Sequence, residues 1–148
     1  MAAKEFAKPA PGGQQKLQSL LMQIQSYQAM LQDIARQAAL TERAIGEMMA
    51  TIEALEKIPK EKSNEALIPI GSGVYAKGQL KDKEKVILTV GSSVHLEKTY
   101  SEAKVFLEGK TKILEANDVK LHQQAVAVNQ QLEAMNAEAE QMYAAMQK

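Results

Sequence analysis

The segment Gly73-Val-Tyr-Ala-Lys-Gly78 has the glycine spacing of a phosphate-binding loop. Such a loop requires Lys and then Ser or Thr after its last glycine, followed by a helix whose amides face the phosphate. Gln79 and Leu80 stand at those positions here, and the pattern that follows is that of a strand. We therefore interpret the glycines of this region as turn or bulge residues, and we predict no nucleotide site.

The other residue types that commonly catalyse reactions or bind metals are too dispersed for either task. The sequence contains no cysteine, and its two histidines, His95 and His122, fall in different predicted elements. A zinc site needs histidines or cysteines at close, characteristic spacing. The acidic residues lie on predicted helix faces, and no nucleophile has a base at a suitable distance in the sequence. We predict a protein that is not an enzyme and that has no metal or other cofactor.

The composition excludes further classes of function. The formal net charge is zero and the basic residues are scattered, which argues against a nucleic-acid partner. No segment approaches the ~20 apolar residues that cross a bilayer, and MAAKEFAKPAPGG lacks the apolar run of a signal peptide. The lack of cysteine fits a reducing compartment. We expect a soluble, cytoplasmic protein with no membrane partner.

The residues that remain to be explained belong to long, patterned segments. Apolar residues follow one another at alternating steps of three and four from Leu17 to Leu55, which is typical of a coiled coil. The series stops near Pro59, because proline ends a helix. We predict a flexible tail at residues 1–14 and a first helix at residues 15–60.

A second helix follows with a matching seam. Thr99 and Glu102 have the spacing of a capping box, and a second apolar series runs from Leu107 to Met146. We predict a helix over residues 99–148 that packs antiparallel against the first.

The antiparallel register places one polar pair in the middle of the seam. It sets Thr41 opposite Asp118, between otherwise apolar layers. We propose that this layer fixes the register at some cost in stability. The alternative is a polar interruption near solvent that has no such role.

Between the helices, residues 65–98 are predicted to form two β-hairpins. Strands at 66–70 and 74–80 flank Gly71-Ser-Gly73, and strands at 86–90 and 94–98 flank Gly91-Ser-Ser93. Isolated hairpins are marginally stable and their edges invite pairing with another chain. We therefore interpret them as an oligomerisation platform. Its apolar residues are Leu67, Ile68, Ile70, Val74, Ala76, Leu80, Val86, Leu88, Val90, Val94 and Leu96.

The central residues resemble a known family. The stretch LIPIGSGVYAKGQLKDKEKVILTVGSSVHLEK, followed by TYSEAKVFLEGKTKIL, is similar to the α-class prefoldin subunits. The shared features are a Leu-Ile-Pro-Ile entry strand, a Gly-Gln-Leu turn, a Val-Gly-Ser-Ser hairpin and a Leu-Glu-Lys exit. The close match covers roughly residues 66–114, and the flanking helices match in pattern only.

The resemblance implies both an architecture and a function. The fold class would be α+β: a long antiparallel α-helical coiled coil with two central β-hairpins that join an intersubunit β-barrel. Two α and four prefoldin β subunits would form a hexamer (α2β4). Its coiled-coil tips would hold non-native client proteins without ATP and deliver them to a group II chaperonin.

The residues at the tips are assigned by physical reasoning, because the family has no fixed motif there. Apolar residues at the free helix ends are expected to stay partly exposed, and methionine suits a surface that accepts many shapes. Ordinary seam packing is the alternative for each of them. The candidates are Leu17, Leu20, Leu21, Met22, Ile24, Leu132, Met135, Met142, Tyr143 and Met146.

Two other functions compete with this interpretation. A structural coiled-coil scaffold would use the hairpins to build a filament or tether, and the sequence leaves open whether the chain forms a hexamer or a homomeric filament. An amphipathic helix on a membrane surface is disfavoured, because a basic face is missing. Protection of a denatured protein from aggregation without ATP would favour the chaperone.

Overall fold

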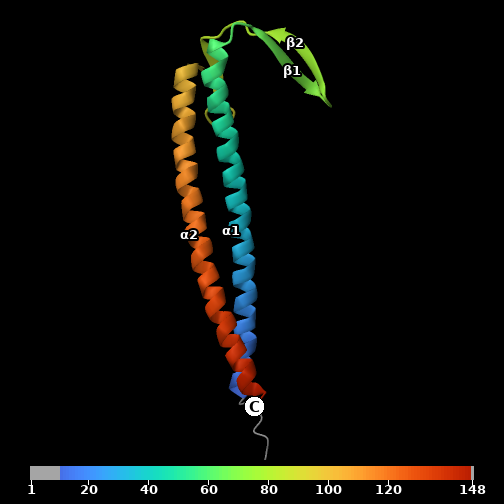
Figure 1. Cartoon of the computed structure of the whole chain (residues 1–148), viewed down its shortest axis with the longest axis vertical. Helices are drawn as coiled ribbons and strands as arrows, with labels where there is room; N and C mark the ends of the chain where they lie inside the picture. Colours follow the sequence, from blue (N-terminus) through green and yellow to red (C-terminus); the bar gives the residue numbers. More distant parts are fainter. Residues whose placement is uncertain (1–10, 148) are drawn as a thin grey trace, which may run out of the picture. The chain divides into compact units, whose positions relative to one another are not determined.

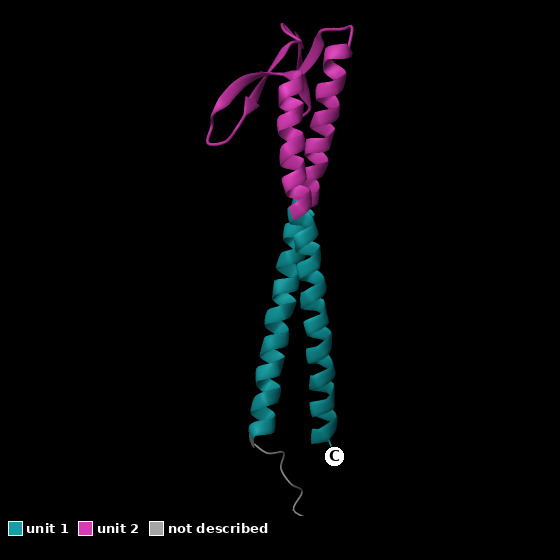
Figure 2. Cartoon of the chain, turned by 90° about the vertical axis from the view of Figure 1, so that its left-hand side faces the viewer, with its two compact units in different colours: residues 1–41, 117–148 teal, residues 42–116 magenta. Residues whose placement is uncertain are grey.

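The computed structural model describes residues 11–147 of the chain (Figure 1). Residues 1–10, which form most of the predicted tail, lie outside this range. The described chain divides into two compact units (Figure 2). We call residues 1–41 with 117–148 the helical unit, and residues 42–116 the hairpin unit.

Two long helices contribute to both units. Helix α1 spans Pro11–Lys57 and helix α2 spans Tyr100–Met146, each with 47 residues. Residues 11–14, which the sequence pattern assigned to the tail, therefore belong to α1. The 3-10 turn η1, Ile58–Lys60, follows α1 at Pro59, whose nitrogen has no hydrogen to donate.

The start of α2 is fixed by a side-chain cap. The hydroxyl oxygen of Thr99 accepts a hydrogen bond from the backbone N–H of Glu102 at 3.1 Å. This contact satisfies one of the amides that the first turn of a helix leaves without a partner. The cap predicted from the sequence is thereby confirmed.

The helical unit consists of the beginning of α1 and the end of α2, side by side and antiparallel (Figures 1 and 2). Its core follows the predicted seam, because steps of three and four keep one face of each helix toward the other. Apolar burial of this kind is the main source of its stability. The buried core residues are Leu17, Leu20, Ile24, Ile34, Leu121, Val128, Leu132, Met135 and Ala139.

In the hairpin unit, the end of α1 packs against the beginning of α2. The hydroxyl of Thr111 donates to the carbonyl of Leu107 at 2.8 Å and lies 3.7 Å from the sulfur of Met48. This contact is the one expected from the predicted antiparallel register. Ala103, at 2% exposure, lies in the first turns of α2 and is the most buried apolar residue described.

The solvent faces of the helices carry ion pairs as well as exposed apolar side chains such as Leu40 and Ile113. Ion pairs of the i,i+3 and i,i+4 type lie along α1, such as Arg36–Asp33 at 3.3 Å and Arg43–Glu47 at 3.2 Å. Exposed pairs of this type contribute little to stability. No helix in the described part of the chain has the length and apolar character needed to cross a membrane.

The two hairpins form separate two-stranded antiparallel sheets. The first pairs β1 with β2, and its register shifts between Pro69 and Gly71, which leaves Ile70 bulged. The second pairs β3 with β4 in a regular register. The strands are β1 Glu65–Gly71, β2 Val74–Gln79, β3 Lys85–Thr89 and β4 His95–Thr99.

The turns contain the glycines expected from the sequence. Gly71 and Gly73 have φ of 142° and 80°, which glycine adopts without the strain of a side chain. Ser92 and Ser93 turn the second hairpin with φ of 39° and 63°. The segment that resembled a phosphate loop is thus a turn followed by strand β2, as predicted.

Lys83 joins two of the links between the elements through hydrogen bonds. The ammonium of Lys83 donates hydrogen bonds to the carbonyl oxygens of Glu61 and of Ser63, the latter at 2.9 Å. The link between the two hairpins is thereby attached to the link between η1 and β1.

Candidate functional site

Half of the predicted client-binding residues are buried in the seam of the helical unit. These side chains are at most 9% exposed, so the expectation of partial exposure is wrong for them, and seam packing accounts for their apolar character. The reason is that α1 and α2 continue far enough to cover each other there. The five residues are Leu17, Leu20, Ile24, Leu132 and Met135.

The other five predicted residues reach solvent to different degrees. Met22 is 70% exposed and Tyr143 is 49% exposed, so both lie off the seam, as expected. Leu21, Met142 and Met146 are half-buried and pack against the core of the helical unit. These five side chains form a partly exposed apolar set on the described ends of the two helices.

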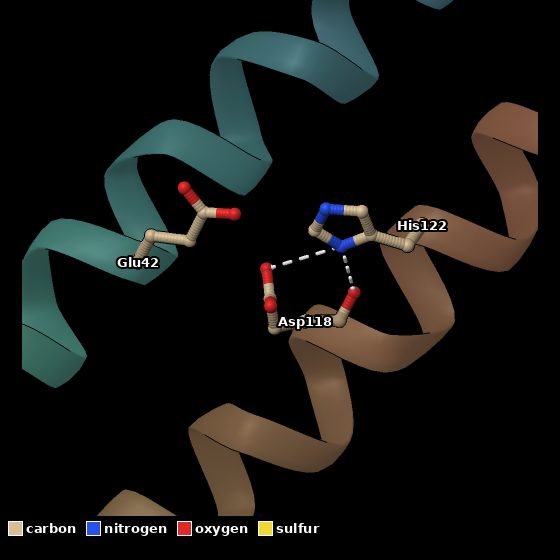
Figure 3. Close-up of side chains that lie close together, drawn as sticks. All are labelled: Glu42, Asp118 and His122. Carbon is tan, nitrogen blue, oxygen red and sulfur yellow. Dashed lines mark hydrogen bonds and ion pairs between the residues drawn. The ribbon is translucent and has the colours of Figure 1, made fainter.

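Asp118 and His122 form a polar pair on one side of α2 (Figure 3). The Nδ1 atom of His122 lies 2.9 Å from the backbone oxygen of Asp118 and 3.5 Å from its Oδ1. The second contact is an ion pair when the imidazole is protonated. Because two ligand atoms from one helical turn are fewer than the four of a structural zinc site, we interpret the pair as a polar contact beside the seam. Glu42, also drawn in Figure 3, belongs to the hairpin unit.

The other member of the predicted polar layer, Thr41, is satisfied within its own helix. Its hydroxyl donates to the carbonyl oxygen of Gln37 at 2.8 Å. Thr41 and Asp118 are both half-buried in the helical unit. The role of this layer in fixing the register remains a prediction.

The first hairpin exposes apolar side chains on both of its faces. Ile70 is 70% exposed, and Leu67, Ile68 and Val74 are also exposed. Ala76 is half-buried. Leu80, just after β2, is 36% exposed. A two-stranded sheet with this much uncovered apolar surface has no core of its own.

The second hairpin is better covered on one face. Val86, Leu88 and Val90 are half-buried, whereas Val94 and Leu96 are exposed. A shallow groove lies between this hairpin and the first turns of α2. Its apolar lining comes from Leu88, Val90, Val105 and Phe106.

Two exposed apolar residues of the hairpins were not singled out from the sequence. Ile87 is 73% exposed on β3, and Tyr75 is 58% exposed on β2. Each lies on the strand face opposite the one that alternation assigned to the interior. Both faces of these strands therefore carry apolar side chains, a signal that two-residue periodicity alone obscures.

The main electrostatic contact of the hairpin unit joins its two helices. The ammonium of Lys104 lies 2.5 Å from a carboxylate oxygen of Glu56 and 3.7 Å from one of Glu108. The hydrogen bond to Lys104 holds the pKa of Glu56 below its usual value. The same bond raises the pKa of Lys104 above its usual value.

The chain resembles known proteins over most of its length. A family model described as prefoldin subunit matches residues 27–145. Prefoldin subunit alpha of Methanobrevibacter smithii is 33% identical over 103 residues, and the match covers 70% of both chains.

Two solved structures share the fold. A filamentous PFD from Methanocaldococcus jannaschii has a TM-score of 0.68 at 21% identity, over 78% of this chain and 96% of that one. The prefoldin beta subunit from Thermococcus strain KS-1 has a TM-score of 0.62 at 22% identity, over 90% and 93%.

Proposed function

Because this chain belongs to the prefoldin family of chaperone subunits, we propose that it is the α-class member of a hexamer with two α and four β subunits. The hexamer acts in the cytosol, holds unfolded client proteins without ATP and passes them to a group II chaperonin. The proposal accounts for the exposed apolar side chains in two parts of the chain: the hairpins and the helix ends.

The observation that carries the proposal is the exposure of the hairpins. Ile70 and Ile87, on different hairpins, are both at least 70% exposed, and each sheet contains only two strands within the described residues. Burying such a side chain contributes about 1.5–3 kcal/mol. Strands from other subunits would cover these residues and pair with the strand edges, closing a β-barrel between subunits.

Client binding is assigned to the helix ends. Met22 and Tyr143 are exposed, and Leu21, Met142 and Met146 are partly exposed beside them. Flexible thioether side chains adapt to many client shapes. Weak contacts from several subunits would add up through their high effective concentration.

A homomeric filament is the second candidate. One similar structure is described as a filamentous PFD, and free strand edges suit open assembly as well as closed assembly. Electron microscopy of this chain alone distinguishes the two, because the hexamer requires β subunits and the filament does not.

The test of the main proposal is co-expression with a prefoldin β subunit. Native mass spectrometry should give a complex of two copies of this chain and four β subunits. That complex should suppress light scattering by a denatured protein without ATP. A complex that forms but gives no protection would favour a structural scaffold.

A further inference from the structure

Methionine supplies all the sulfur of this chain. The sequence contains eight methionines and no cysteine. Two-electron oxidants such as hydrogen peroxide attack the sulfur of cysteine and methionine side chains. Because no thiol competes for the oxidant here, methionine is the side chain that a peroxide modifies first in this protein.

The methionines of the described chain differ widely in exposure. Met22 is 70% exposed, Met49 is 57% exposed and Met30 is 46% exposed. Met135, by contrast, is 9% exposed and belongs to the core of the helical unit. Since the oxidant must reach the sulfur atom, the chain contains a graded series of targets.

Three methionines belong to the partly exposed apolar set at the helix ends, to which client binding is assigned. Met22 lies on α1. Met142 and Met146 lie on α2, where both are half-buried and pack against the core of the helical unit. Met146 is the last residue of α2. Because helix ends fray, the thioethers of Met142 and Met146 become accessible in the frayed state.

Oxidation replaces an apolar thioether by a polar sulfoxide. A lone pair of the sulfur attacks one oxygen of the peroxide, the O–O bond breaks, and a bond between sulfur and oxygen forms. The sulfur is oxidised by two electrons and the peroxide is reduced. The second peroxide oxygen leaves as hydroxide and takes up the proton of the transferred hydroxyl, which gives water. Methionine sulfoxide reductases reverse the modification.

We propose that Met22, Met142 and Met146 are modification sites for peroxides, and that their oxidation to sulfoxides weakens client binding at the helix ends. This inference rests on the proposed function and adds a chemical control of the same site. The reduced chain holds clients, the oxidised chain holds them weakly, and reduction restores the first state.

The weakening follows from the cost of covering a sulfoxide. A client that covers Met22 in the reduced chain removes apolar surface from water, which is favourable. The same contact in the oxidised chain buries a polar oxygen, which is unfavourable unless the client supplies a hydrogen-bond donor. Clients of many shapes do not present a donor at one fixed position, so most of them lose affinity.

The hairpins contain no target for this reaction. Residues 65–99, which include all four described strands, have no methionine. Oxidation therefore leaves the apolar residues of both hairpins chemically unchanged, and we expect the oxidised chain to assemble with β subunits. Loss of client binding can thus be separated from loss of assembly.

Peptide mass spectrometry of the full chain in hydrogen peroxide measures the order of oxidation. Met22 should react fastest, Met142 and Met146 more slowly, and Met135 slowest. The rate at Met135 should be on the order of tenfold below the rate at Met22, because its sulfur reacts only after local opening. Equal rates at Met22 and Met135 would overturn the assignment of the targets.

Client protection is measured with the oxidised chain in its complex. The chain is oxidised alone, the peroxide is removed with catalase, and β subunits that were never exposed to peroxide are added. Native mass spectrometry should still give two copies of this chain and four β subunits. Equal suppression of light scattering should require on the order of tenfold more oxidised complex. Methionine sulfoxide reductases for both sulfoxide epimers should restore suppression.

Leucine variants assign the effect to the helix ends. Leucine is close to methionine in volume and has no sulfur to oxidise. The triple variant Met22→Leu, Met142→Leu, Met146→Leu should therefore protect clients equally well with and without peroxide treatment. Met22→Leu alone, at an exposed position that folding does not depend on, should retain part of the protection. A triple variant as sensitive as wild type would refute the inference.

The matched control replaces Met30 and Met49 by Leu. Both side chains are exposed but lie outside the set at the helix ends, so this variant should lose protection on oxidation as wild type does. Resistance of this control to peroxide would contradict the assignment.

The outcomes also separate this inference from the proposed function. Equal protection by the reduced and the oxidised complex would refute the inference alone, and so would failure of the oxidised chain to assemble. If the reduced complex gave no protection, the proposed function would fail and the inference with it.

Discussion

The ammonium of Lys104 lies 2.5 Å from the carboxylate of Glu56 and so links the beginning of α2 to the end of α1. The pair lies in the hairpin unit, close to the turn η1. It holds the two helix ends together at the point where the chain leaves for the first hairpin and returns from the second.

Replacing Glu56 by Gln should lower the melting temperature at neutral pH, because the ion pair with Lys104 is lost. The pKa of Glu56 is lowered in the folded chain. The stabilisation is therefore complete above the pKa of an unfolded glutamate, about 4.3, and disappears as the pH falls through the folded value. Circular dichroism melts should show a difference between E56Q and wild type at pH 7 that vanishes at low pH.

The alkaline side of this profile follows from Lys104. The pKa of Lys104 is raised in the folded chain. Its contribution to the stability of the fold is therefore complete below the ordinary lysine pKa, and it is lost as the pH rises through the pKa that Lys104 has in the folded chain. Glu53→Gln is the control for the loss of an ion pair that does not join the two helices, because Glu53 pairs with Lys57 within α1 alone. A difference between E56Q and wild type that persisted at low pH would contradict this account.

Replacing both Thr41 and Asp118 by Leu should raise the melting temperature. Apolar side chains in the seam avoid the cost of burying polar groups, and each kcal/mol gained corresponds to about 2–4 °C for a chain of this size. Thr51→Leu is the control, because Thr51 is exposed and its hydroxyl makes the same i−4 bond, to Glu47 at 2.8 Å. A lower melting temperature for the double variant would refute the destabilising role of the layer.

Thr99→Ala should destabilise α2 by removing its cap. Loss of a threonine cap costs about 1 kcal/mol, which corresponds to a fall of roughly 2–4 °C in melting temperature. Thr99→Ser keeps the hydroxyl and should stay close to wild type. An equal loss in both variants would show that the methyl group, and not the hydrogen bond to Glu102, is responsible.

Replacing Met22 and Tyr143 by Ser should reduce client protection while leaving the fold and the hexamer intact. Met22 is 70% exposed and Tyr143 is 49% exposed, and neither belongs to the buried core of the helical unit. Met49→Ser is the matched control, because Met49 is also exposed but lies in the hairpin unit. Light scattering with a denatured client should require several-fold more double variant for equal protection. Unchanged protection would place client binding elsewhere.

The sequence was sufficient for the helices and their seam. Leu17, Leu20 and Ile24 are buried at successive steps of three and four residues, so the pattern specifies the buried face directly. The cap at Thr99 was predictable because its bond is local. The start of α1 was not, since Gly12 and Gly13 disfavour a helix, whereas Pro11 fits its first position.

Specific contacts between residues that are distant in the sequence could not be predicted from it. The seam pattern does not say which flanking charges meet, so the pair of Lys104 with Glu56 had to be seen in the structure. Likewise, alternation assigns faces to a strand but not the direction of its N–H groups. The backbone N–H of Leu80 donates to the carbonyl oxygen of Asn64. Following the register of the hairpin from this bonded pair in steps of two places the backbone of Pro69 toward the open edge of β1.

The central claim is that other subunits complete the hairpins. Hydrogen exchange followed by mass spectrometry, on peptides covering residues 65–80 and 85–99, tests it most directly. In the isolated chain at low concentration, the strand amides that are not hydrogen-bonded within their own hairpin should exchange rapidly. Assembly with β subunits should strongly slow the exchange of these amides. Amides already protected in a monomer, or unchanged on assembly, would contradict the claim.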